Sequence, residues 1–217
     1  NELQADSYVP MDISADYLQT ACDMLAEDFP ELDIHAVCAD ISHSMPLPDG
    51  LSNSPRVVFF PGSSLGNFHY HEARQFLSMI NKTIGHNGMF LIGVDTKKPV
   101  EILNAAYNDA AGVTAEFNLN LLHRIRSELD SALNIDNFDH RAFYNANKGR
   151  IEMYLVSQCD QRVRIGPHEF EFESGESVHT ECSYKYTPEE FLALARQANL
   201  EPVEYWLADD ELFGLYL

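Results

Sequence analysis

The chain has 217 residues, 45% of them apolar, so it can bury a sizeable core as one domain or as a domain with an inserted subdomain. Fourteen Lys and Arg stand against 34 Asp and Glu, which gives a formal net charge of -20 at pH 7. This charge repels phosphate backbones and anionic membrane surfaces, so we expect neither nucleic acid nor a membrane as a partner. A cationic ligand is favoured instead.

The cysteine pattern and the start of the chain bear on its setting. The four cysteines contain no CxxC pair, and a chain of this size folds without disulfides, so we expect a cytoplasmic protein. No feature of the sequence indicates an obligate protein partner, and we expect none. No apolar run reaches the roughly 20 residues that span a bilayer. A predicted strand begins within a few residues of Asn1 and no initiator Met precedes it, so we expect the chain to be a piece of a longer protein.

The first part of the chain alternates apolar strands with amphipathic helices. Strands are predicted at residues 7–13, 33–39, 56–60 and 89–95, and helices at residues 15–27 and 71–83. Ser14 stands where a helix N-cap belongs. Alternating strands and helices indicate crossover connections, so we predict an α/β fold with a doubly wound parallel sheet.

The pattern changes after residue 98. Helices are predicted at residues 99–107, 114–129 and 135–144, and period-two alternation then predicts antiparallel strands at residues 150–158, 161–166, 168–173 and 177–186. Thr187 is the predicted N-cap of a helix at residues 188–198, and two further strands are predicted at residues 202–207 and 211–217. The change is typical of an insertion into the parallel sheet.

Acidic residues end two of the predicted parallel strands, where ligands bind in an open sheet. Asp12 fits an acceptor for both hydroxyls of a ribose, and Asp40, at the end of the next strand, fits an acceptor for an adenine amino group. Spacing alone gives about equal weight to the alternative that each aspartate caps the helix after it.

The segment PGSSLGN, residues 61–67, is a glycine-bearing turn between a strand and a helix. It lacks the Lys of a P-loop and the spacing of a dinucleotide fingerprint. We interpret it as a close approach of the backbone to a small ligand, with Asn67 offering a donor and an acceptor. An ordinary strand-to-helix turn is the alternative.

Metal and hydrolase chemistry have less support. His69 and His71 have no third ligand at a metal-like spacing nearby, so we expect solvated or core histidines and no metal. The chain has no GxSxG elbow and no cysteine with the local signature of a nucleophile.

Five segments in order along nearly the whole chain carry a family resemblance: YVPMDIS, FFPGSSLGNF, YNDAAGVTAEFN, RIEMYLVS and HTECSYKY. Together they resemble the histidine-specific Nα-methyltransferases of ergothioneine biosynthesis, which use S-adenosylmethionine. The resemblance implies a class I, Rossmann-like methyltransferase sheet with an inserted α+β substrate-binding subdomain. Residues 1–98 would form the cofactor-binding core, residues 99–187 mainly the subdomain, and residues 188–217 would complete the fold.

The resemblance also implies residue roles on the cofactor side and in the glycine-bearing turn. Asp12 would bind the cofactor ribose, and Asp40 and Ile41 would frame the adenine. Gly62 and Asn67 would lie against the substrate amino acid.

On the substrate side, the resemblance implies that Asn67 and Tyr107 hold the amino and carboxylate end of histidine. Glu181 and Ser183 would hold the imidazole, and Met153 would pack beside it. A site built to hydrogen-bond a polar ring rejects apolar analogues, because its buried polar groups would be left unpaired. A solvent-facing strand position is the alternative for Glu181.

The expected chemistry is direct displacement at a sulfonium methyl group, for which alignment and exclusion of water matter most and no covalent nucleophile or metal is required. The attacking amine must first lose a proton to water or to a nearby carboxylate. The sequence does not identify the base.

The chain departs from the family at its start. Class I methyltransferases place a glycine-rich turn after a first, central strand, and this chain has neither before Asp12, so we expect a preceding segment to supply both. Two other hypotheses stay open: a related N-methyltransferase for another amino acid or a sulfur-bearing histidine derivative, and a truncated, non-catalytic fragment that keeps the fold.

Overall fold

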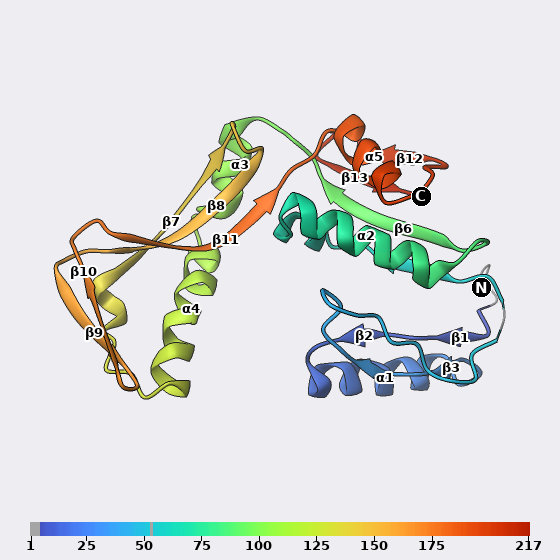
Figure 1. Ribbon diagram of the computed structural model, residues 1–217, viewed down its shortest axis with the longest axis horizontal. Helices are drawn as coiled ribbons and strands as arrows, with labels where there is room; N and C mark the ends of the chain where they lie inside the picture. The colour runs from blue at the N-terminus through green and yellow to red at the C-terminus, as the bar shows by residue number, and fades with distance from the viewer. Residues whose placement is uncertain (1–4, 53) are drawn as a thin grey trace.

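The computed structural model describes residues 5–52 and 54–217 (Figure 1). In chain order the elements are β1 (Ser7–Tyr8), β2 (Met11–Asp12), α1 (Ala15–Asp28), β3 (Asp33–Ile34), β4 (Val37–Cys38), β5 (Val57–Phe60), the 3-10 turn η1 (Ser64–Asn67), α2 (Tyr70–Ile84), β6 (Met89–Asp95), α3 (Val100–Tyr107), α4 (Val113–Glu128), the 3-10 turn η2 (Ile135–Asn137), β7 (Phe138–Asn145), β8 (Arg150–Ser157), β9 (Gln161–Ile165), β10 (His168–Phe172), β11 (Ser177–Tyr184), α5 (Pro188–Gln197), β12 (Tyr205–Leu207) and β13 (Phe213–Tyr216).

The main sheet has four strands in the order β12-β13-β6-β5, with β5 parallel and β13 antiparallel to β6. Apolar residues of α2 and α5 pack on this sheet, and the core between them is centred on Phe76, Ile80, Ile92 and Leu194, each at most 2% exposed. This arrangement confirms the predicted α/β class.

The predicted strands at residues 7–13 and 33–39 form a parallel pair that is interrupted in the middle. β1 pairs with β3 and β2 with β4, and Pro10 lies between the two pairs. Proline has no N–H to donate, although its carbonyl oxygen still accepts from the amide of Val37 at 3.0 Å. The break is therefore local, and the carboxyl ends of both strands stay at one edge.

The outer edge of β5 and one edge of β1 and β2 have no partner strand within the part of the chain that the structure describes. β5 is the last strand of its sheet, and Val57 and Phe59 on one of its faces are 63% and 62% exposed. β1 and β2 likewise pair on one side only. Parallel sheets normally have both faces and their inner edges covered, so these edges agree with the prediction of a sheet that lacks its first strand.

The segment between β6 and α5 forms a second unit, on the left of Figure 1, in which α3 and α4 lie against an antiparallel sheet of order β11-β8-β7. A hairpin of β9 and β10 extends it. Two small apolar cores hold the unit together, one around Leu122, Phe138 and Leu155 and one around Leu103 and Met153. The four antiparallel strands predicted after residue 149 are confirmed.

The predicted helix at residues 135–144 is wrong. After the short turn η2, residues 138–145 form β7, which pairs antiparallel with β8 along its whole length. Phe138 and Ala142 are buried while Asp139 and Arg141 are exposed, so apolar and polar positions alternate with strand period through this part. The local pattern of this segment is compatible with a helix or a strand. Pairing with β8, which lies later in the chain, favours the strand.

Two chain segments join the second unit to the main sheet, and they are bonded to each other. Thr96 and Tyr186 form a parallel bridge, in which the amide of Tyr186 donates to the carbonyl of Asp95 and that of Lys97 to the carbonyl of Tyr186, both at 3.2 Å. Just beyond this bridge, Thr187 caps α5 as predicted, accepting from the amide of Glu190.

Candidate active site

Asp12 ends β2, and Asp40 lies just beyond the carboxyl end of β4, the parallel strand that pairs with β2. In this pairing Asp12 is the register partner of Cys38. Both are exposed, and both accept hydrogen bonds within their own loops, but neither is a helix N-cap, because α1 begins after Ser14 and a turn rather than a helix follows Asp40. Asp12 Oδ1 accepts from the amide of Ser14 at 2.8 Å, and Asp40 Oδ1 accepts from the amide and the hydroxyl of Ser42 at 2.9 and 2.6 Å. Ser14 holds the N-cap position of α1 without a side-chain cap bond. A carboxylate has about four acceptor positions, so capacity for a ligand remains on each.

The local hydrogen bonds fix the charge of the Asp40 carboxylate. The Ser42 hydroxyl and then the Ser42 amide lower the pKa of Asp40, which keeps it ionised and able only to accept. The next residue, Ile41, is half-buried and packs against the main core. An acceptor and an apolar side chain thus stand together beyond the end of β4.

The PGSSLGN turn is anchored at the end of β6. Ser63 has a left-handed backbone with φ 57°, and its hydroxyl oxygen accepts from the amide of Asp95 at 2.8 Å. Gly66 is buried, and a Cβ there would lie 2.8 Å from the carbonyl oxygen of Tyr184 and 3.2 Å from Ser183 Oγ. A Cβ at Gly62 would meet only Ser64 Oγ at 3.7 Å. Within the protein, the backbone of this turn therefore packs closely against β11 at Gly66, and the space beside Gly62 is open.

The predicted substrate residues lie together where η1 meets the second unit. Glu181 of β11 is the register partner of Met153 of β8, which is 2% exposed. Ser183 follows two residues later on the same strand and is buried, while Asn67 at the end of η1 lies close enough to the Glu181 carboxyl group to lower its pKa. Residues from η1, β8 and β11 thus converge.

Glu181 is half-buried, which argues against the solvent-facing alternative. Burial raises the pKa of its carboxyl group, and the hydrogen bond from Asn67 and the charge of Lys185 offset that effect only in part. A carboxyl group held in this way suits an N–H donor of a ligand better than it suits water.

Lys185 joins the rest of the cluster and was not identified from the sequence. Its side chain is 1% exposed, and its Nζ donates to Tyr107 Oη and to Ser183 Oγ, both at 3.0 Å. The third partner is Asp95 Oδ2 at 2.6 Å, and Asp95 Oδ1 also accepts from Lys98. A lone lysine between two tyrosines in SYKY, near the end of a half-buried strand, is the signal that could have marked it.

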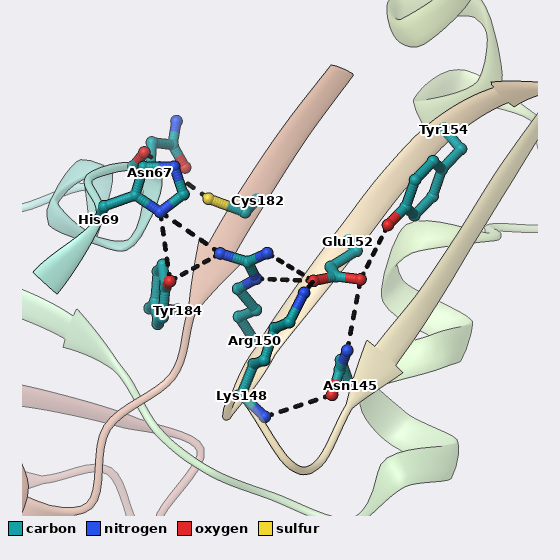
Figure 2. A network of polar contacts seen from close by, with 9 residues as sticks. All are labelled: Asn67, His69, Asn145, Lys148, Arg150, Glu152, Tyr154, Cys182 and Tyr184. Carbon is teal, nitrogen blue, oxygen red and sulfur yellow. Dashed lines mark hydrogen bonds and ion pairs between the residues drawn. The ribbon is translucent and has the colours of Figure 1, made fainter. Parts of the chain in front are cut away.

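A second buried ion pair supports the same region from β8 (Figure 2). Arg150 donates to Glu152 Oε1 through Nε at 2.9 Å and Nη2 at 2.5 Å, and Glu152 is 2% exposed. Arg150 Nη1 donates to the hydroxyl of Tyr184 at 2.6 Å and lies 3.4 Å from Nδ1 of His69, the residue just after η1 and Phe68. Burial alone would raise the pKa of Glu152, but its donors outweigh burial and hold the pKa at about 2.

Other features of the described residues lie apart from this cluster. A cavity of about 720 Å³ opens at the amino end of β6, lined by Met89, Phe191 and Val203 among others, and none of the nine predicted site residues lines it. Within residues 5–52 and 54–217, no group of three or more His, Cys, Asp or Glu is placed to hold a metal ion. In the same residues no helix is long and apolar enough to cross a membrane.

Comparisons with known proteins bear on this arrangement. A family model described as histidine-specific methyltransferase, SAM-dependent, matches residues 1–217. The histidine N-alpha-methyltransferases of Mycolicibacterium smegmatis and Mycobacterium tuberculosis are both 34% identical to this chain, over 97% of the chain and 65% of their own length. The chain therefore spans a little less than two thirds of these curated relatives. The solved structure of the CcbJ methyltransferase from Streptomyces caelestis has a TM-score of 0.50 and 14% identity, covering 96% of this chain and 72% of that one, which supports the class I methyltransferase fold.

Proposed function

Since the chain belongs to the histidine-specific, S-adenosylmethionine-dependent methyltransferase family, we propose that the full-length protein methylates the α-amino nitrogen of L-histidine to give trimethylhistidine, as in ergothioneine biosynthesis. The observation that carries this proposal is the convergence of Asn67, Glu181 and Ser183 beside the buried Met153. A polar pair and an apolar side chain fit the edge and the face of an imidazole ring.

The ring would lie over the face of the paired strands β8 and β11 that carries these side chains. Glu181 accepts one ring N–H, and Ser183 hydrogen-bonds the other ring nitrogen. Because both side chains are withdrawn from water, a ligand that leaves them unpaired binds weakly, and this excludes apolar amino acids.

The amino and carboxylate end of histidine would lie toward η1 and α3. The Tyr107 hydroxyl group accepts a hydrogen bond from Lys185, which places it at the edge of the cluster. The side-chain amide oxygen of Asn67 can accept from the substrate amine. Gly62 leaves open space beside the turn. These contacts orient the nitrogen, and the buried walls exclude water from it. The proton that the amine loses passes to water or to a nearby carboxylate.

Asp12, Asp40 and Ile41 would hold S-adenosylmethionine, which when bound supplies a methyl group on a sulfonium. The two carboxylates fit this ligand because they are exposed, have spare acceptor positions and stand at the ends of neighbouring parallel strands. Asp12 would accept from the ribose hydroxyls, and Asp40 from the adenine amino group.

The remaining part of the cofactor site would come from the rest of the full-length protein. The open edges of β5 and of β1 and β2 suit a strand that pairs with both, followed by a glycine-rich turn. We therefore assign residues 1–98 to the cofactor-binding core, 99–187 mainly to the substrate-binding subdomain and 188–217 to the completion of the fold. The four cysteines are free thiols, in keeping with a cytoplasmic setting.

A related N-methyltransferase with another amine substrate is the second candidate. More distant relatives at 24% and 26% identity are named N-methyltransferase fsqC and 4-dimethylallyltryptophan N-methyltransferase easF, both from Aspergillus fumigatus. The polar pair of Glu181 and Ser183 favours histidine over a bulky apolar ring.

The test is incubation of the full-length protein with methyl-labelled S-adenosylmethionine and L-histidine. We expect labelled trimethylhistidine, and transfer to a different amine with none to histidine would contradict the proposal. Glu181→Gln should lower kcat/KM for histidine, whereas Glu169→Gln, an exposed strand glutamate in the β9–β10 hairpin, should not. Calorimetry of the 217-residue chain with S-adenosylmethionine decides whether it binds alone, since a normal heat would exclude a decayed, non-binding fragment.

A further inference from the structure

Lys185 has a position that the proposed reaction does not by itself require. It follows β11 directly, and its backbone amide donates to the carbonyl of Gly149 in the β7–β8 turn at 2.9 Å. Its side chain crosses to the end of β6, where the ammonium group is 2.6 Å from Asp95 Oδ2. The residue thus bonds the second unit through its backbone and the main sheet through its side chain.

The ammonium group has three hydrogens and three oxygen partners. Besides Asp95, these are Tyr107 Oη and Ser183 Oγ, each at 3.0 Å, and the Nζ also stands 5.0 Å from the centre of the Tyr107 ring. A buried cation is costly unless it is paired and fully hydrogen-bonded, and this one is both. The directions of its three N–H bonds are therefore fixed.

This geometry determines how the two hydroxyl groups can be used. An ammonium group only donates, so Tyr107 and Ser183 must accept from it, and each hydroxyl hydrogen points elsewhere. Within residues 5–52 and 54–217, neither hydroxyl donates to a protein acceptor. Both hydrogens are available to a ligand.

We propose that Lys185 is a positioning residue that presents the Tyr107 and Ser183 hydroxyl groups to the substrate as hydrogen-bond donors. This inference rests on the proposed function for the identity of the substrate. The Tyr107 hydrogen meets the substrate carboxylate, and the Ser183 hydrogen meets a ring nitrogen without a proton. Because Glu181 on the same strand accepts from the other ring nitrogen, the site selects the neutral imidazole in one tautomer.

The experiment compares Lys185→Met with Lys97→Met in the full-length protein. Lys97 stands at the same end of the sheet, pairs with the exposed Glu190 and contacts no predicted substrate residue. We expect Lys185→Met to raise the Kd for L-histidine about tenfold or more in calorimetry, with the Kd for S-adenosylmethionine nearly unchanged and Lys97→Met without effect. Equal weakening of both ligands, or no weakening, would overturn the proposal.

A double-mutant cycle separates positioning from a merely structural role. Ser183→Ala and Tyr107→Phe are each made with and without Lys185→Met. If Lys185 acts through the hydroxyls, each change costs less histidine affinity when lysine is already absent, and additive losses would contradict the proposal. Lys185→Arg keeps the charge and the donors, so it should restore part of the affinity.

Thermal unfolding of the same variants without ligand keeps the inference separate from the proposed function. If the wild-type protein binds no histidine, the proposed function fails. The melting-temperature shifts for Lys185 with Ser183 and with Tyr107 then decide the inference. Non-additive shifts support the hydrogen bonds to the two hydroxyls, and additive shifts overturn them. If Lys185→Met does not fold, the cycle is measured with Lys185→Met combined with Asp95→Asn, which removes the partner charge that loss of the lysine leaves unpaired.

Discussion

Replacing Glu152 by Gln should destabilise the protein far more than its modest change in shape suggests. The carboxylate is 2% exposed and accepts on Oε1 from Arg150 and Lys148 and on Oε2 from Tyr154 at 2.9 Å. A glutamine can keep its oxygen toward Arg150, and the Tyr154 hydroxyl can turn to accept from the new amide. The charge on the buried Arg150 is nevertheless left uncompensated.

The expected loss follows from that uncompensated charge. Removing one partner of a buried ion pair costs about 3–5 kcal/mol, and because Tyr154 can adapt we expect about 3 kcal/mol. A pKa lowered from 4.5 to about 2 gives a similar figure, about 3 kcal/mol at about 1.4 kcal/mol for each pH unit. Against a typical total of about 5–15 kcal/mol, this is a large part of the stability.

Urea denaturation of the full-length protein measures this loss, with Glu128→Gln as the control. Glu128 pairs with Arg124 at 2.9 Å, but both side chains are more than half exposed, so no measurable change is expected there. A loss below about 1 kcal/mol for Glu152→Gln would refute the reasoning. Arg150→Met combined with Glu152→Leu should recover part of the stability, because no lone charge then stays buried.

The same pair predicts a pH dependence. The pKa of Glu152 is lower in the folded protein than in the unfolded chain, so its contribution is complete above about pH 4.5 and is lost as the pH falls toward about 2. The stability difference between wild type and Glu152→Gln should therefore narrow across that window. A difference that stays constant would show that Glu152 does not titrate in this way.

Three further predictions concern the cofactor end, the η1 turn and Glu181. Asp12→Ala should raise the Kd for S-adenosylmethionine about tenfold or more without changing the Kd for histidine, while Asp16→Ala, in the first turn of the following helix α1, should change neither. Calorimetry measures both constants, and an equal loss of affinity for both ligands would contradict the prediction. Gly66→Ala puts a Cβ 2.8 Å from the Tyr184 carbonyl oxygen, so histidine affinity and melting temperature should both fall, and wild-type values for both would disprove that contact. Because burial raises the pKa of Glu181, its ionisation costs stability as the pH rises above about 4.5, so Glu181→Gln should gain stability relative to wild type as the pH is raised from there. Thermal unfolding at several pH values that shows no such gain would count against this prediction.

The sequence was sufficient for features that depend on local pattern. Alternating strands and helices predict the parallel sheet, and the residues after its strands include Asp12 and Asp40, which lie at one edge as expected. The antiparallel alternation that starts at Arg150 likewise predicts β8 to β11. The helix predicted over residues 135–144 was wrong, because residues 138–145 become a strand through pairing with β8, a tertiary contact that local pattern does not show.

The site could be predicted only in part, since buried charges are identified by their neighbours in space. Glu181 and Ser183 were found through a motif, whereas Lys185, two residues later, is defined by Asp95 and Tyr107, which come 90 and 78 residues earlier in the chain. The pairing of Arg150 with Glu152 looks in sequence like two solvated charges at alternate strand positions. Only burial at 7% and 2% exposure distinguishes it from a surface pair.

The bridge between Thr96 and Tyr186 has a consequence for motion. The two segments that join the second unit to the sheet exchange hydrogen bonds at Asp95, Lys97 and Tyr186, so neither can rotate independently of the other. Any hinge movement of the second unit must bend both together, next to the buried ammonium of Lys185. Opening and closing over the sheet would then be one collective step, and the amides of Lys97 and Tyr186 would exchange with solvent at a common rate.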